Sequence, residues 1–87
     1  MFRMDIFTAL ADPTRRKILK MLSRRQMSAG DIADKFDMTH SAVSQHLKAL
    51  RAANLVTMQV DAQRRLYSYN AVGLKKFNQF LNDLDTD

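Results

Sequence analysis

The 87-residue sequence contains no cysteine and no glutamate, and it has only one proline and two glycines. Without cysteine, disulfides, thiolate metal sites and cysteine nucleophiles are excluded, and a reducing, cytoplasmic setting is expected. So few turn-forming residues indicate a chain made mostly of regular secondary structure. No apolar run approaches about 18 residues, and the first five residues lack the apolar core of a signal peptide, so we expect no membrane insertion.

Positive charge is present in excess and is unevenly placed. The net charge is +5, from 14 Lys and Arg against 9 acidic residues, all of them Asp. The first 51 residues carry the whole excess, because the remainder holds equal numbers of basic and acidic side chains. A basic balance of this kind favours a polyanionic partner, either a nucleic acid or a membrane surface. The length allows a single domain over residues 1–87.

Two helices are predicted near the N-terminus. Apolar residues spaced four apart predict a short amphipathic helix over residues 4–10. Asp12 followed by Pro13 marks a second helix start, because Asp caps an N-terminus and Pro suits the first helical position. Its apolar stripe continues to about Ser23.

Two further helices are separated by a tight turn. Ser28 and Asp31 have the spacing of a capping box, which starts a short helix that ends near residues 37–38. Thr39 caps the next helix, which covers residues 40–53. A gap of only three or four residues between two helices predicts a helix-turn-helix.

After residue 54 the pattern changes to strand. Residues 55–60 and 66–69 are rich in β-branched and aromatic side chains, and residues 61–65 connect them as a hairpin. Helical spacing returns over residues 72–84. The predicted fold is therefore mainly α with a β-hairpin wing: four helices, two strands and a last helix, which is a winged helix-turn-helix.

The helix over residues 40–53 carries the chemistry of groove reading. Val43, Leu47 and Leu50 form its core side, and the opposite side is short, polar and free of acidic residues. Gln can bind adenine through two hydrogen bonds, and Ser can contact several base edges. The residues predicted to contact bases are Ser41, Ser44 and Gln45. His40, at the helix start, is a further candidate, for which a DNA contact and no contact are equally compatible with the sequence.

Other polar residues are predicted to contact the DNA backbone. Lys48 and Arg51 lie further along the helix and reach phosphates, and Thr39 can both cap the helix and donate to a phosphate. Arg64 and Arg65 lie at or just after the wing tip, where a basic side chain enters the minor groove or contacts phosphates. The sequence does not distinguish between these two arginines.

The sequence contains neither a recognisable active site nor a metal site. His40 and His46 are six residues apart, whereas two ligands on one helix need a spacing of four. The aspartates at positions 31, 34 and 37 are expected to be solvated charges, and no cofactor is predicted. The alternatives to a DNA-binding repressor are an enzyme, a protein-interaction module and an RNA-binding domain. The acid-free polar helix face argues against a protein-interaction module. An RNA-binding domain is disfavoured because the deep, narrow major groove of A-form RNA does not admit a helix.

The terminal segments, about residues 4–10 and 72–84, carry more large apolar side chains than one small core can cover. Pairing them across a two-fold axis would bury these side chains and set two recognition helices about one DNA turn, roughly 34 Å, apart. A palindromic operator follows from such a homodimer. The predicted interface residues are Phe2, Ile6, Leu74, Phe77, Leu81 and Leu84.

These motifs resemble the ArsR/SmtB family of bacterial repressors. The segment at residues 12–19, D-P-T-R-R-K-I-L, is similar to the family's opening helix, and residues 41–50, S-A-V-S-Q-H-L-K-A-L, to its recognition helix. Asn54 stands where the family usually has glycine. The resemblance covers roughly residues 5–84 and implies a winged-helix homodimer that blocks a promoter and dissociates on a signal.

The same resemblance argues against metal sensing. Ser28 and Gly30 stand in place of the two cysteines of the family's metal-sensing motif. The last helix has no histidine and, of the acidic residues, only Asp83 near its end. The chain therefore looks similar to the short, metal-free members, some of which repress their own operons and are relieved by a protein anti-repressor.

Overall fold

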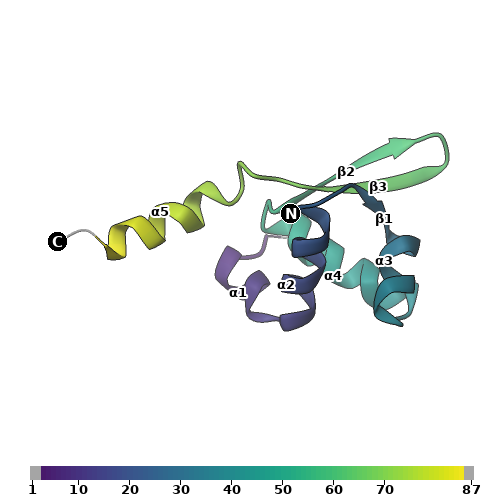
Figure 1. Ribbon diagram of the computed structural model, residues 1–87, viewed down its shortest axis with the longest axis horizontal. Helices are drawn as coiled ribbons and strands as arrows, with labels where there is room; N and C mark the ends of the chain where they lie inside the picture. The colour runs from purple at the N-terminus through teal and green to yellow at the C-terminus, as the bar shows by residue number, and fades with distance from the viewer. Residues whose placement is uncertain (1–2, 86–87) are drawn as a thin grey trace.

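The computed structural model describes residues 3–85, and in this part of the chain the helices and the hairpin follow each other in the predicted order (Figure 1). Phe2 therefore lies outside the described residues. The elements are α1 (Ile6–Ala11), α2 (Pro13–Leu22), β1 (Met27–Ser28), α3 (Ala29–Phe36), α4 (His40–Ala52), β2 (Val56–Asp61), β3 (Arg64–Tyr69) and α5 (Lys75–Leu84). None of these helices is long and apolar enough to cross a membrane.

Side-chain caps define the starts of the first four helices. The carboxylate of Asp5 accepts hydrogen bonds from backbone N–H groups of α1, and Asp12 does the same for α2. Ser28 and Asp31 form the predicted capping box of α3, and Thr39 accepts from a backbone N–H of α4. These caps satisfy donors that have no partner inside the helix. The second, third and fourth helices therefore begin where the sequence predicts, whereas α1 begins at Ile6, two residues later than predicted, because Asp5 caps it.

The sheet has three strands rather than the predicted two. β2 and β3 form the wing as an antiparallel hairpin, in which Asp61 pairs with Arg64 across a two-residue loop. The additional strand, β1, pairs antiparallel with the other side of β3, so the strand order is β1-β3-β2. A two-residue strand has no periodicity to detect, and it exists here only because β3 supplies its partner. β1 therefore ties the hairpin to the start of α3.

A single core joins the helices to the base of the wing. Its fully buried side chains come from the first four helices and the start of the hairpin, and the largest of them are Ile18, Ile32, Val43, Leu47, Leu50 and Leu55. The predicted core side of α4 is confirmed. Tyr67 is buried and Tyr69 is half-buried against the same cluster. These contacts fix the orientation of α4 and leave its opposite face to solvent.

The helix-turn-helix is formed by α3 and α4, which are joined by residues 37–39. Asp37 ends α3 in the left-handed conformation, with φ of 52°, and this residue reverses the chain tightly enough for α4 to begin at His40. α4 ends near Asn54, which is also left-handed, with φ of 63°. Glycine adopts this conformation most easily, and asparagine tolerates it better than most other residues.

α5 begins three residues later than predicted. The segment 70–74 forms consecutive turns, because the N–H groups of Gly73 and Leu74 donate to carbonyls three residues earlier. Leu74 consequently precedes the helix and packs against the core of its own chain. Figure 1 shows α5 running away from the other helices, toward the end of the molecule opposite the wing tip. No residue of α5 is buried.

Candidate nucleic-acid interface

The outer face of α4 is exposed and polar, as the sequence predicts. Ser41, Ser44 and Gln45 are all exposed; Ser41 and Gln45 lie opposite the buried core side of the helix, and Ser44 lies on the flank between the two sides. No acidic residue occurs anywhere in α4. The three side chains therefore form one compact surface that can enter a major groove without repelling phosphates.

Both ends of this surface carry groups that suit a phosphate backbone. Thr39 and His40 are exposed at the start of α4, and the Thr39 hydroxyl accepts a hydrogen bond of 3.1 Å from the N–H of Ala42. Lys48 and Arg51 are exposed along its second half. The N-terminus of a helix and flanking cations are the usual contacts for phosphate oxygens. All seven helix residues predicted to contact DNA thus lie on one accessible strip.

Beside this strip lies a hollow of about 400 Å³ that the sequence does not reveal. Its cationic members are Arg15 of α2 and Lys48 of α4. The Arg15 side chain is only 18% exposed, and its Nη1 and Nη2 lie 3.3 Å from the Met4 sulfur and 3.8 Å from the Asp12 carboxylate. The Arg15 Nε is buried and has no hydrogen-bond partner. The complete lining consists of Met4, Arg15, Gln45, His46, Lys48 and Ala49.

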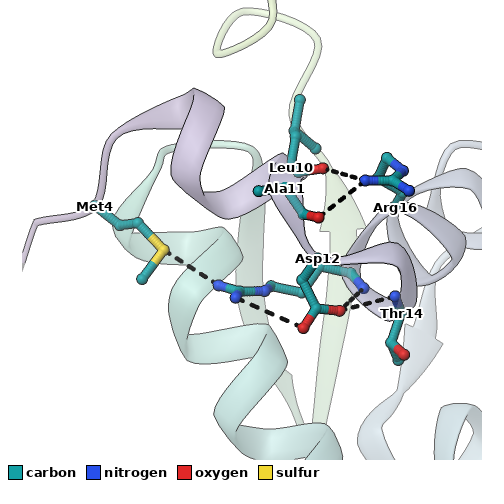
Figure 2. Close-up of polar contacts among 7 residues, drawn as sticks. Met4, Leu10, Ala11, Asp12, Thr14 and Arg16 are labelled. Carbon is teal, nitrogen blue, oxygen red and sulfur yellow. Dashed lines mark hydrogen bonds and ion pairs between the residues drawn. The ribbon is translucent and has the colours of Figure 1, made fainter.

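Local hydrogen bonds hold the start of α2, and with it Arg15, in place. The N–H groups of Arg15 and Thr14 donate to the Asp12 carboxylate, and they lower the pKa of Asp12 together with the positive charges of His46 and Arg15. The adjacent Arg16 donates to the carbonyls of Leu10 and Ala11 at the end of α1 (Figure 2). Arg15 and Arg16 therefore have different surroundings, although they are neighbours in the sequence.

The structure also distinguishes the two arginines of the wing. Nη2 of Arg64 lies 3.4 Å from a carboxylate oxygen of Asp31, in the capping box of α3. The same box lowers the pKa of Asp31, first through the Ser28 side chain and then through the Ser28 backbone N–H. Arg65 is exposed and forms no ion pair within residues 3–85. Arg64 thus has an acidic partner on α3, although its side chain is still 62% exposed, whereas Arg65 has none within the same residues.

The two histidines occupy different places. His40 is exposed at the start of α4, whereas His46 is half-buried in the lining of the hollow. Among the described residues, no group of three or more His, Cys, Asp or Glu side chains could hold a metal ion. Asp34 and Asp37 are exposed, and Asp31 belongs to the α3 cap.

The terminal helices present an apolar surface that includes two residues absent from the predicted interface, Phe7 and Phe80. The Phe7 ring lies 5.7 Å from that of Phe77 and 5.2 Å from that of Phe80, measured between centroids, so α1 and α5 meet through aromatic contacts. Phe7, Phe80, Leu81 and Leu84 remain 44–66% exposed. Ile6 and Leu74 instead pack partly against the core of their own chain, which leaves less of each side chain for a partner.

Sequence comparison identifies relatives along most of the chain. The profile of the bacterial regulatory protein arsR family matches residues 12–58. The chain is 39% identical to the transcriptional repressor SdpR of Bacillus subtilis over 79 residues, covering 90% of this chain and 88% of the relative. It is 41% identical to the nodulation protein NolR of Rhizobium meliloti, covering 92% and 68% of the two chains.

Comparison with solved structures identifies the same kind of protein as the sequence comparison. The crystal structure of a possible transcriptional regulator for arsenical resistance superposes with a TM-score of 0.85 at 31% identity, covering 97% of this chain and 88% of the other. The expected winged helix-turn-helix fold is thereby confirmed, and so is the expectation that the chain is not an enzyme. The chain belongs to the ArsR family of bacterial regulatory proteins and is a winged helix-turn-helix transcriptional regulator that binds DNA.

Proposed function

We propose that this protein is a homodimeric repressor that reads a palindromic operator with α4 and the wing over residues 61–65. The observation that carries the proposal is the exposed, acid-free polar face of α4, held outward by a fully buried opposite side. A solvated helix face usually mixes Lys and Glu, whereas this one is suited to base edges. The location expected for such a repressor is the cytoplasm, where bacterial DNA is found.

Base reading is assigned to the centre of this face. Gln45 can donate to and accept from adenine at once, and Ser41 and Ser44 can contact neighbouring base edges. His40, at the exposed start of the helix, is assigned to the edge of the same site. These side chains are short, so a base contact requires the helix to enter the major groove closely.

Backbone anchoring is assigned to the residues around that centre. Thr39, Lys48 and Arg51 contact phosphates from the two ends of α4. On the wing, Arg65 contacts the DNA directly, because Arg64 is engaged by Asp31. Arg64 instead holds the wing at the angle from which Arg65 can reach the minor groove or its phosphates.

The hollow beside α4 is assigned to a further backbone phosphate. Arg15 and Lys48 both line this hollow, from α2 and α4. A phosphate oxygen seated between the two side chains would form charge-assisted contacts with them. Replacing Arg15 with glutamine should then reduce the slope of log affinity against log salt by about one.

Dimerisation is assigned to the apolar surface of α1 and α5. Four of its large side chains are at least 44% exposed in one chain, and a two-fold axis would bury them against their own copies. Of the interface residues expected from the sequence, Phe77, Leu81 and Leu84 contribute most to this surface. Ile6 and Leu74 form its edge, and Phe2 belongs to the proposed interface on sequence grounds alone.

The test compares two substitutions on the same helix. Gln45→Ala should weaken binding to the operator while leaving binding to random DNA unchanged, so that sequence preference falls. Lys48→Ala should weaken both to a similar extent, and Lys17→Ala on the exposed side of α2 serves as its control. Fluorescence anisotropy with the DNA upstream of the protein's own gene, against random competitor, measures both effects. A uniform loss with both variants would contradict the division into reading and anchoring residues.

A further inference from the structure

A cavity of about 300 Å³ lies where the end of α1, one side of α2, the end of β3 and the turn before α5 meet. This α2–β3 cavity is open to solvent and shares no residue with the hollow beside α4. Figure 2 shows Arg16 beside Leu10, two members of its lining, away from Met4, which lines the other hollow. The complete lining consists of Leu10, Arg16, Leu19, Lys20, Ser23, Tyr69 and Leu74.

The walls of the α2–β3 cavity are mostly apolar. Leu19 is buried, and Leu10, Tyr69 and Leu74 are half-buried and pack against the core. Removing apolar walls of a concave surface from water is favourable, and such walls are typical of small-molecule sites. A volume of about 300 Å³ lies at the lower end of the range for these sites, so the cavity suits a small apolar body.

The rim of the cavity carries two positive charges. Arg16 and Lys20 are exposed and four residues apart, so they lie on the same side of α2. Nη1 of Arg16 donates to the carbonyls of Leu10 and Ala11, which fixes the guanidinium at the end of α1 and leaves its other N–H groups for a ligand. Neither Arg16 nor Lys20 forms an ion pair within residues 3–85. Both charges are therefore without an acidic partner in this part of the chain.

The segments that form the cavity contain no acidic residue. None occurs in α1, in residues 13–30 or in residues 66–82. Asp12, between α1 and α2, is already engaged, because its carboxylate accepts from the N–H groups of Thr14 and Arg15 and lies 3.8 Å from the Arg15 guanidinium. Uncompensated positive charge at the mouth of a cavity attracts anions. Charge complementarity therefore favours an anionic ligand.

The combination of apolar walls and a cationic rim narrows the class of ligand. A nucleic acid or a polyphosphate would pair with the two cations but leave the apolar walls in water. An uncharged apolar molecule would cover the walls but gain nothing from the cations. A carboxylate on a small apolar body uses both features, because a guanidinium binds a carboxylate through parallel hydrogen bonds and the body removes the walls from water.

We propose that the α2–β3 cavity binds a small hydrophobic carboxylate. Its carboxylate lies between Arg16 and Lys20 at the rim, and its apolar body lies against Leu19 and Tyr69. None of the residues assigned to DNA contacts lines this cavity. The inference therefore goes beyond the proposed repressor, and its test requires neither an operator nor DNA.

The first test compares three probes of equal chain length: octanoate, octylammonium and 1-octanol. Titration of the full chain at low salt, followed by NMR of the backbone N–H groups, gives each dissociation constant. Octanoate should bind best, and octylammonium about tenfold more weakly, because both rim cations repel it. Lys20→Gln should weaken octanoate binding about two- to fivefold, as the loss of an exposed ion pair does, and should leave 1-octanol binding unchanged. Lys17→Gln, exposed on the same helix but outside the lining, is the matched control.

A second variant tests the location. Ser23 is exposed at the end of α2, so the large ring of Ser23→Phe fills the cavity from its rim without entering the core. Octanoate binding should be lost, while Arg24→Phe, at the exposed neighbouring position outside the lining, should retain it. Circular dichroism verifies that both variants fold. In the original chain, octanoate should shift the N–H signals of Ser23 and Leu74 and leave those of Ser44 and Gln45 unchanged.

Each contrary result overturns a defined part of the proposal. Equal affinity for octanoate and octylammonium would refute the anionic class of ligand. Unchanged octanoate binding in Ser23→Phe would place the ligand elsewhere, such as on the exposed apolar surface of α1 and α5, and would refute the site. If octanoate affinity falls as rising protein concentration drives dimerisation, measured by analytical ultracentrifugation, a second copy covers the cavity. The ligand site would then be wrong, whereas the proposed homodimer would stand.

Discussion

Replacing Gly73 with alanine should destabilise the protein strongly, although it adds only one methyl group. Gly73 is buried in the turn between β3 and α5. A Cβ built on it would lie 1.6 Å from the carbonyl oxygen of Asn54 and 2.7 Å from the carbonyl carbon. The obstacle is backbone, so rotation of a side chain cannot relieve it.

The size of the effect follows from this distance. Ordinary van der Waals contact begins at 3.4 Å, so the two backbone segments must separate by about 2 Å. Overpacking of a core costs about 1–3 kcal/mol, and a clash between two backbones belongs at the upper end, near 3 kcal/mol. The separation also strains the hydrogen bonds that Asn70 makes to Asn54 and Leu55. For a domain of this size, the melting temperature should fall by about 12–24 °C.

Thermal and urea unfolding, followed by circular dichroism, measure this loss, with Gly30→Ala as the control. A Cβ at Gly30 lies 3.3 Å from the edge of the His40 ring, which can move, and 3.8 Å from the Ser28 hydroxyl, which is ordinary contact. Alanine also favours the helix by up to about 1 kcal/mol, so Gly30→Ala should change stability little or raise it. Equal stability of Gly73→Ala and the original chain would refute the close approach of residues 54 and 73, and with it the position from which α5 starts.

Four further predictions concern other parts of the chain. Leu50→Ala, at a fully buried position of α4, should cost about 2–5 kcal/mol in urea unfolding, and a cost below 1 kcal/mol would be inconsistent with the core described. Because hydrogen bonding and nearby positive charge lower the pKa of Asp12, its carboxylate stabilises the fold above the unfolded pKa of about 3.9, and this stability is lost as the pH falls through the lower folded-state value. In Asp12→Asn, the free energy of unfolding should therefore fall less steeply as the pH is lowered below about 4. An unchanged pH dependence would contradict the role of the Asp12 carboxylate as the cap of α2. Ala62→Gly should stabilise the wing by up to about 1 kcal/mol, because Ala62 has φ of 58°, and lower stability would argue against this turn. EDTA or added zinc should leave DNA affinity unchanged, and a clear shift would reveal a metal site.

Local signals account for the parts of the fold that were predicted correctly. Asp12 with Pro13, Ser28 with Asp31, and Thr39 each act on backbone groups within three residues, so the helix starts can be deduced from neighbours in the sequence. The reading face of α4 is equally local. Once Val43, Leu47 and Leu50 face the core, the helical period places Ser41, Ser44 and Gln45 outside.

Long-range contacts account for the parts that were not predicted. β1 consists of two residues whose partners in β3 are Leu66 and Tyr67, far along the chain, and no pattern within two residues can indicate such pairing. The start of α5 depends in the same way on the fit of Gly73 against Asn54. Helical spacing over residues 72–84 continues through this turn, so the prediction placed the helix start too early.

The sequence by itself thus determined the winged helix-turn-helix fold, its caps and the face of α4 that meets solvent, because each depends on spacing and capping within a few residues. Only the tertiary structure decided which cations remain available. Asp31 engages Arg64 and leaves Arg65 exposed, and the packing of α2 on α4 places Arg15 in a hollow beside the reading face. The aromatic contact of Phe7 with α5 also depends on the tertiary structure. The partners in each case belong to elements that are distant in the sequence, and only folding brings their charges and rings within reach.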